Sequence, residues 1–226
     1  MSEGIRALRI SPGARGKVAG VVASFPSAWQ GAVLDVGCRT RELETALAQK
    51  PVNYIGLDIR PPADVIADLD EGIPISGAAV RTVVALDVLE HTDRIHDALA
   101  ELFRVSSRIV IVSLPNCYHF RIRWAHLRGK PISGKYGLPA SPPADRHRWF
   151  FSFHEARQFC QTLAEKHGWM VAEERFGSGP KLSRIAAVVR RFPNLLAQTY
   201  FVVLLNPKGG PLTESITEQA DVSLAH

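Results

Sequence analysis

The feature that most constrains the fold of this sequence is an alternation, from Ala32 onward, of short β-branched runs with windows of helical apolar period. Such alternation is typical of a mostly parallel sheet with helices on both faces. Continuous apolar runs such as residues 82–86 suit strands that are buried on both sides. We therefore expect a doubly wound α/β fold with seven strands, at residues 32–35, 54–58, 64–67, 82–87, 108–113, 169–175 and 199–205.

Two helices are predicted with a defined buried face. One lies between the fourth and fifth strands, and the other begins at Ser152, where Ser152-Phe153-His154-Glu155 matches a capping box. The second helix continues to about His167 and turns Cys160 inward. The first has a stripe at helical spacing that we expect in the core: Ile95, Ala98, Leu99, Leu102 and Phe103.

The length of 226 residues, with 46% hydrophobic composition, suits one sizeable core and is short for two domains. We expect a helical segment at residues 1–30, one domain at residues 31–206 and a disordered polar tail at residues 207–226. The domain contains an insertion at residues 115–150. This insertion is too long for an ordinary connection, and such loops are usually functional or disordered.

The cysteines and the hydropathy of the sequence indicate the cellular compartment of the protein. Cys38, Cys117 and Cys160 lack the spacing of a zinc site or a disulfide framework, which fits a reducing cytosol. The most apolar late stretch, residues 195–205, contains Gln198 and is about half the length that a bilayer span needs. We therefore expect a cytoplasmic protein without a membrane span.

Positive charge is concentrated in the insertion. Residues 115–150 carry seven Lys and Arg against one Asp, whereas the whole chain has a net charge of +5. A local excess indicates an anionic ligand or partner rather than a general polyanion-binding surface. Because no RNA-binding module is recognisable, nucleic acid is not the expected partner.

Acidic residues follow successive predicted strands, at the edge where open parallel sheets bind ligands. Asp58 comes 21 residues after Gly37, the spacing at which a carboxylate reaches a ribose diol. A turn that binds a dinucleotide needs glycine at three positions, in the pattern GxGxxG. Here these positions hold Gly37, Arg39 and Glu42, so two of the three glycines are missing. The positive charge of S-adenosylmethionine (SAM) suits an acidic edge, so the pattern favours SAM over a dinucleotide.

The motifs at these strand ends resemble those of class I SAM-dependent methyltransferases. Residues 33–38, Val-Leu-Asp-Val-Gly-Cys, resemble motif I, and residues 54–58, Tyr-Ile-Gly-Leu-Asp, resemble the second motif. Residues 85–91, Ala-Leu-Asp-Val-Leu-Glu-His, resemble the fourth-strand motif of the type 11 group. Ser113-Leu114-Pro115-Asn116, with the aromatic and arginine-rich stretch after it, resembles the MetW proteins of methionine biosynthesis.

The resemblance implies a Rossmann-like sheet whose last strand is antiparallel, with Asp58 on the ribose and Asp68 with Leu69 near adenine. The GxGxG pattern of motif I departs at its second and third positions, Arg39 and Arg41. Arg39 either narrows the space beside the methionine moiety or pairs with its carboxylate. The expected SAM-binding residues are Asp35, Val36, Gly37, Cys38, Arg39, Asp58, Ile59, Asp68, Leu69, Leu86 and Asp87.

Asp87, Glu90 and His91 are the candidate catalytic residues, as a general base or a metal site. We favour the alternative in which Glu90 and His91 cap the following helix and line the pocket, with no metal bound. The sulfonium already activates methyl transfer, so a base is needed only for a protonated hydroxyl or amine acceptor.

Cations interleave with aromatic residues in the insertion, which suits a lid that clamps an anionic or sugar-like small molecule. A solvated basic flap is the alternative. The predicted function is methyl transfer from SAM to such an acceptor; a SAM-binding or SAM-fold module that acts with a partner enzyme is the second hypothesis, favoured by Arg39 and Arg41. The expected acceptor-binding residues are His119, Arg121, Arg123, Trp124, Tyr136, Arg146, His147 and Arg148.

Overall fold

A computed structural model of the chain describes residues 5–8, 14–130, 140–141, 146–178 and 185–209. The strands are β1 (Arg6–Leu8), β2 (Gly31–Val36), β3 (Val52–Asp58), β4 (Val65–Ile66), β5 (Val80–Leu86), β6 (Ser106–Pro115), β7 (Met170–Gly177) and β8 (Thr199–Leu205). The α-helices are α1 (Ala14–Ser24), α2 (Glu42–Leu47), α3 (Ile95–Val105), α4 (Phe120–Leu127), α5 (Phe153–Lys166), α7 (Ala186–Arg191) and α8 (Pro193–Leu196), and 3-10 turns lie at η1 (Pro26–Ala28) and η2 (Leu89–His91).

All strands form one sheet in the order β1-β7-β8-β6-β5-β2-β3-β4. Strand β8 is antiparallel to both β6 and β7, and the other pairings are parallel. The predicted Rossmann-like fold is therefore confirmed. The strand count is eight rather than seven, because Arg6–Leu8, in a segment expected to be helical, pairs with the edge strand β7. Three residues are too few to show an alternating pattern in the sequence.

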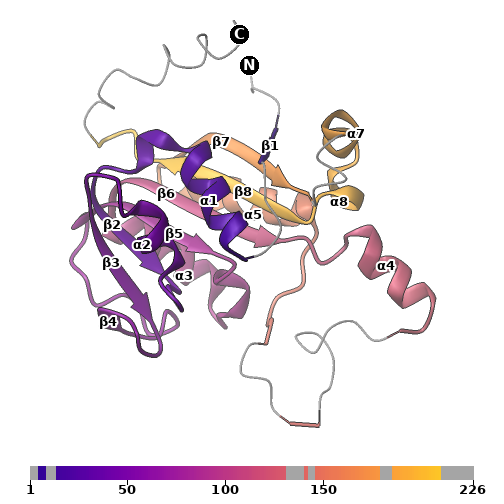
Figure 1. The fold of residues 1–226 in the computed structure, drawn as a ribbon, viewed down its shortest axis with the longest axis horizontal. Coiled ribbons are helices and arrows are strands. Elements are labelled where there is room, and N and C mark those ends of the chain that lie inside the picture. Colours follow the sequence, from indigo (N-terminus) through magenta and orange to yellow (C-terminus); the bar gives the residue numbers. More distant parts are fainter. Residues whose placement is uncertain (1–4, 9–13, 131–139, 142–145, 179–184, 210–226) are drawn as a thin grey trace, which may run out of the picture.

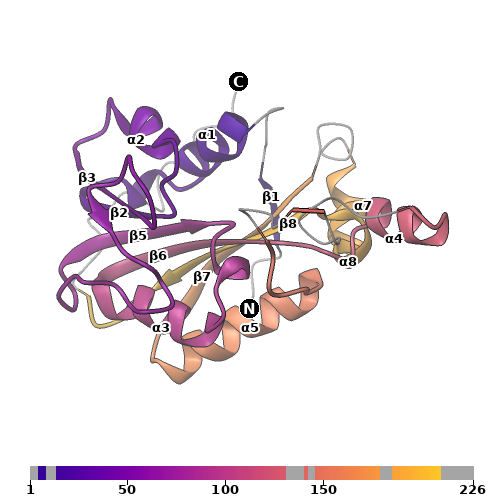
Figure 2. The ribbon, with the colours of Figure 1, turned by 90° about the horizontal axis from the view of Figure 1, so that it is seen from below.

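Helices cover both faces of the sheet. Helices α1 and α2 lie on one side, and α3 and α5 lie on the other (Figures 1 and 2). Helix α5 begins at Ser152, whose side chain and that of Glu155 form both hydrogen bonds of the predicted capping box. No helix among the described residues is long and apolar enough to cross a bilayer.

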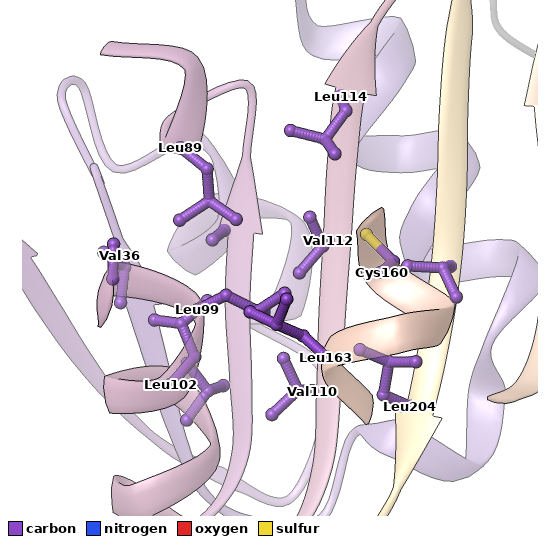
Figure 3. Packing of buried hydrophobic residues seen from close by; sticks show 14 of the residues in the cluster. Val36, Leu89, Leu99, Leu102, Val110, Val112, Leu114, Cys160, Leu163 and Leu204 are labelled. Atoms are coloured by element: carbon purple, nitrogen blue, oxygen red, sulfur yellow. The ribbon is translucent and has the colours of Figure 1, made fainter. Parts of the chain in front are cut away.

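The central strands are buried on both faces of the sheet. Successive side chains of a strand point to opposite faces and pack in two separate hydrophobic cores. In β6, Ile109 and Ile111 pack on the α1 and α2 side, whereas Val110, Val112 and Leu114 pack against α3 and α5. Figure 3 shows part of the second core, with Leu99 and Leu102 of α3 and the fully buried Cys160. All five residues of the predicted α3 stripe belong to this core. Each fully buried Leu or Ile stabilises the fold by about 1.5–3 kcal/mol, so these two cores account for much of the stability of the sheet.

Three helices lie where no helical period was predicted: α4 in the insertion, and α7 with α8 before β8. Helix α4 follows the carboxyl end of β6 and projects away from the body of the sheet (Figure 1). None of its residues is buried. Its position near the predicted binding edge therefore comes from its connection to β6 rather than from packing.

Candidate functional site

The turn after β2 requires a glycine at position 37. Gly37 has φ of +73°, and a Cβ added there would lie 2.5 Å from Cγ2 of Val88. The amides of Gly37 and Cys38 both donate to the carbonyl of Leu57, at 2.7 and 3.1 Å. The turn is thus held between the end of β3 and the residue that precedes η2.

Arg39 and Arg41 occupy backbone positions that favour glycine. Their φ values are 43° and 57°, in the left-handed region that costs other residues roughly 1–2 kcal/mol. The guanidinium of Arg41 binds Glu44 Oε2 at 2.7 Å and Asp64 Oδ1 at 3.0 Å, and stacks over the ring of Tyr54. Arg41 is therefore engaged by acidic side chains, while the side chain of Arg39 is exposed.

Asp58 ends β3 beside this turn. Its Oδ2 accepts a hydrogen bond of 3.0 Å from the amide of Arg39, and its Oδ1 accepts one of 3.3 Å from the amide of Arg60. An ionised carboxylate has about four acceptor positions, so two remain for further donors. The next residue, Ile59, is exposed. The structure thus brings together the glycine turn and the carboxylate that the sequence assigns to a ribose.

Asp35 is the buried carboxyl of the site. Its Oδ2 accepts a hydrogen bond of 2.8 Å from the hydroxyl of Tyr54. Burial raises the pKa of Asp35 to about 7, against the lowering effects of the Tyr54 hydrogen bond and the Arg41 charge. Burial also raises the pKa of the neighbouring Cys38 to about 11, which keeps this thiol protonated at neutral pH.

Asp87 receives two contacts that the sequence analysis missed. Ser113 Oγ donates to Asp87 Oδ1 at 2.7 Å, and Lys17 of α1 forms an ion pair with Asp87 Oδ2. Ser113 belongs to the motif at the end of β6, so the sequence could have indicated its contact with Asp87. The sequence could not have indicated the contact of Lys17, because Lys17 lies 70 residues from Asp87 in the chain. The two remaining expected cofactor residues of β2 and β5 are Val36, which is buried, and Leu86, which is half-buried.

The loop after β4 supports α3. Asp68 is exposed and accepts the amide of Asp70 at 2.9 Å, and Leu69 is buried. The Asp70 carboxylate accepts the amides of Asp93 and Arg94, both at 2.9 Å, just before α3. The predicted capping of α3 by Glu90 and His91 is therefore wrong, because the carboxylate that binds the amides before α3 is that of Asp70, from another loop.

A cavity of about 470 Å³ lies beside this loop and α3. Leu69, Asp70 and Arg94 are among the residues that line it, whereas Gly37 is not.

Glu90 and His91 lie in η2, where residues 146–149 of the insertion meet them. The amides of Arg148 and Trp149 donate to the carbonyl of Glu90, at 2.8 and 3.3 Å. Nε2 of His91 and Nε2 of His147 each lie 4.0 Å from Glu90 Oε1. The end of the insertion is thus fixed against the turn after β5.

The other expected acceptor residues surround α4. His119 is buried, and its Nδ1 accepts the amide of Arg121 at the start of α4; burial, with the Arg121 charge, lowers its pKa to about 4. Arg121 lies over the ring of Phe120, and Arg123 donates to the carbonyl of Tyr118. Trp124 is 59% exposed, and Tyr136 lies outside the described residues. The predicted lid, in which these residues bind the acceptor, stays a prediction.

Solved structures with this fold include several from the methyltransferases. The chain has 16% identity and a TM-score of 0.57 to a SAM-dependent methyltransferase from Archaeoglobus fulgidus, covering 85% of this chain and 95% of that one. For a magnesium protoporphyrin IX methyltransferase from Synechocystis with bound SAH, the identity is 18% and the TM-score 0.55, over 85% and 83% of the two chains. The [4+2]-cyclase SpnF, with 15% identity, a TM-score of 0.56 and coverage of 92% and 87%, has the same fold.

Sequence comparison is more specific about the family. No curated protein sequence matches the chain. A family profile described as a methyltransferase domain matches residues 14–174, which include α1, the glycine turn, Asp58, η2 and the insertion. Because this match covers more than two thirds of the chain, the protein belongs to the methyltransferase-domain family.

Proposed function

We propose that the protein transfers a methyl group from SAM to a small acceptor that is anionic or sugar-like. The observation that carries the proposal is the contact between the amide of Arg39 and Asp58, which holds the glycine turn against the carboxylate at the end of β3. A nucleoside that lies along this edge meets both elements at once. Membership of the methyltransferase-domain family makes SAM the cofactor that fits this edge.

The carboxylates at the edge match the chemistry of SAM. Asp58 has acceptor positions left for the two ribose hydroxyls, and charge-assisted hydrogen bonds of this kind are short and strong. Asp87 and, above about pH 7, Asp35 supply negative charge near a ligand whose sulfonium and ammonium groups are positive. Methyl transfer then depends mainly on holding the acceptor in line with the carbon–sulfur bond.

Cations border the same edge on the acceptor side. Lys17 contacts Asp87, and Arg148, which forms an ion pair with Asp93, is carried by the segment fixed to Glu90. Cations so close to the reacting region favour an acceptor with a carboxylate, phosphate or many hydroxyls. We include Arg121 and Arg123 among the cations that bind the acceptor.

Calorimetry with SAM and S-adenosylhomocysteine (SAH) tests the cofactor part. We expect binding of both ligands to the full chain, and an absence of heat up to millimolar concentration would contradict the proposal. The transfer part is tested with SAM that carries a deuterated methyl group, incubated with a small-molecule extract and followed by mass spectrometry. Asp58→Ala is the matched control, because it removes the ribose contact and leaves the acceptor side unchanged.

A further inference from the structure

Two imidazoles and one carboxylate converge beside the carboxyl end of β5. The ligand atoms of Glu90, His91 and His147 all lie within 4.8 Å of one another, and within the described ranges no other group of three such residues meets this criterion. We propose that these three side chains bind one divalent first-row transition metal ion, such as Zn²⁺ or Co²⁺. The expectation of a metal-free site, drawn from the sequence, is replaced by this proposal.

The distances suit ligands that flank an ion. Both Nε2 atoms lie 4.0 Å from Glu90 Oε1, beyond hydrogen-bond distance. Ligands at roughly 2.0–2.2 Å from a tetrahedral ion are about 3.4 Å apart, so each ligand atom has to move by less than about 1 Å. Rotation of the side chains supplies a shift of that size without movement of the backbone.

The surrounding hydrogen bonds prepare His91 as a ligand. Nδ1 of His91 lies 3.0 Å from the carbonyl oxygen of Arg146. A carbonyl only accepts, so this contact places the proton on Nδ1 and leaves Nε2, which lies 4.0 Å from Glu90 Oε1, with the lone pair that a metal ion needs. Backbone carbonyls orient metal-binding histidines in this way in many proteins.

His147 is held in position by its neighbours along the chain. The amides of Arg148 and Trp149 bind the Glu90 carbonyl, and the indole of Trp149 donates to the carbonyl of Thr92 at 2.8 Å. The His147 ring lies 4.6 Å from that of His91 in an edge-to-face arrangement and is 5% exposed. A ligand from the insertion is therefore fixed beside two ligands from η2.

The donor set selects the class of metal. Imidazole nitrogens suit the later first-row ions such as Fe²⁺, Co²⁺, Ni²⁺ and Zn²⁺, whereas Mg²⁺, Ca²⁺ and Mn²⁺ suit oxygen ligands. Glu90 is fully buried, and a divalent cation offsets the cost of burying its charge. Three protein ligands leave coordination positions open, as in catalytic rather than structural zinc sites. Those positions would take oxygen atoms of a ligand, and the identification of that ligand with the methyl acceptor rests on the proposed function.

Metal titration of the untagged full chain tests the site without SAM or an acceptor. After removal of metals with a chelator, we expect one Zn²⁺ or Co²⁺ per chain with a Kd in the micromolar range or below. His91→Gln and His147→Gln should each weaken this binding by at least about 100-fold. His96→Gln and His126→Gln, at exposed positions, are the matched controls and should bind as the parent does.

Two results would overturn the assignment: no stoichiometric binding by the folded parent, or equal binding by His147→Gln. Glu90→Gln is the third ligand variant, and circular dichroism shows whether it folds. The open positions are tested separately by adding acetohydroxamate, a bidentate oxygen ligand, to the Co²⁺ form. We expect its visible absorption bands to shift, and an unchanged spectrum would contradict the open positions. The methyl-transfer proposal can fail while metal binding is found, and the reverse also holds.

Discussion

The hydroxyl of Tyr54 donates a hydrogen bond of 2.8 Å to Oδ2 of Asp35, whose side chain is buried beneath the glycine turn. Burial raises the pKa of this carboxyl to about 7 from an ordinary 3.8. Between these values the folded chain keeps a proton that the unfolded chain has lost. The contribution of Asp35 to the free energy of unfolding therefore falls as the pH rises from about 4 to 7.

We predict that Asp35→Asn makes the protein more stable than the parent above pH 7, by about 1–4 kcal/mol. The amide keeps an acceptor for Tyr54 and carries no charge, so the gain should shrink as the pH is lowered toward 5. Urea unfolding at a series of pH values measures the difference. Asp97→Asn, at an exposed position of α3, is the control, and an identical pH dependence of Asp35→Asn and parent would exclude the raised pKa.

Asp58→Ala should weaken SAM binding by about 1–3 kcal/mol, the scale of charge-assisted hydrogen bonds to a ribose diol. Asp58→Asn should lose less, because its amide oxygen still accepts the Arg39 amide that orders the turn. Calorimetry measures both, with Asp97→Ala as the control. Parent-like affinity in a folded Asp58→Ala variant would show that this carboxylate does not contact the ribose.

Gly37→Ala should lower the free energy of unfolding more than Gly168→Ala does. Both glycines have φ of +73°, but an added Cβ at Gly168 meets no atom within 4 Å, whereas at Gly37 it meets Val88 at 2.5 Å. Backbone strain accounts for about 1 kcal/mol in each variant, and the clash adds about 1–3 kcal/mol at Gly37. Denaturant unfolding should show partial recovery in Gly37→Ala/Val88→Ala, and equal losses in the two single variants would contradict the contact.

Lys17→Met should increase the ratio of SAM affinity to SAH affinity by several-fold. Lys17 contacts Asp87 at the binding edge, and removing a positive charge there favours the cationic sulfonium over the neutral thioether. Competition binding of the two ligands measures the ratio, and the exposed Lys50→Met serves as the comparison. A ratio that stays at the parent value would place Lys17 too far from the sulfonium to act on it.

Neutralising Arg121 and Arg148 together, with Gln at both positions, should lower methyl transfer and leave SAM affinity within a factor of a few. The single variants separate the contributions of the two arginines, because Arg148 forms an ion pair with Asp93 near η2, whereas Arg121 lies on the projecting α4. Transfer of the deuterated methyl group is the readout, with Arg190→Gln on α7 as the control. A fall in SAM affinity as large as the fall in transfer would show that the cations serve the cofactor rather than the acceptor.

Local patterns in the sequence determined most of the sheet and the helices that pack on it. The alternation of apolar runs identified seven of the eight strands, and the capping box at Ser152 located the start of α5. The same patterns placed Gly37 and Asp58 at adjacent strand ends, because parallel strands bring their carboxyl ends to one edge. These features depend on residues a few positions apart, so one sequence is enough to predict them.

Tertiary structure alone decided the contacts between segments that are remote in the chain. The ion pair of Lys17 with Asp87 spans 70 residues, and the contact of His91 with Arg146 spans 55. The pairing of β1 with β7 and the convergence of His147 on Glu90 are of the same kind. Neither a hydrophobic period nor a motif encodes which distant side chain lies at a strand end. That is set by how the two buried faces of the sheet pack and by the contact of residues 146–149 with η2.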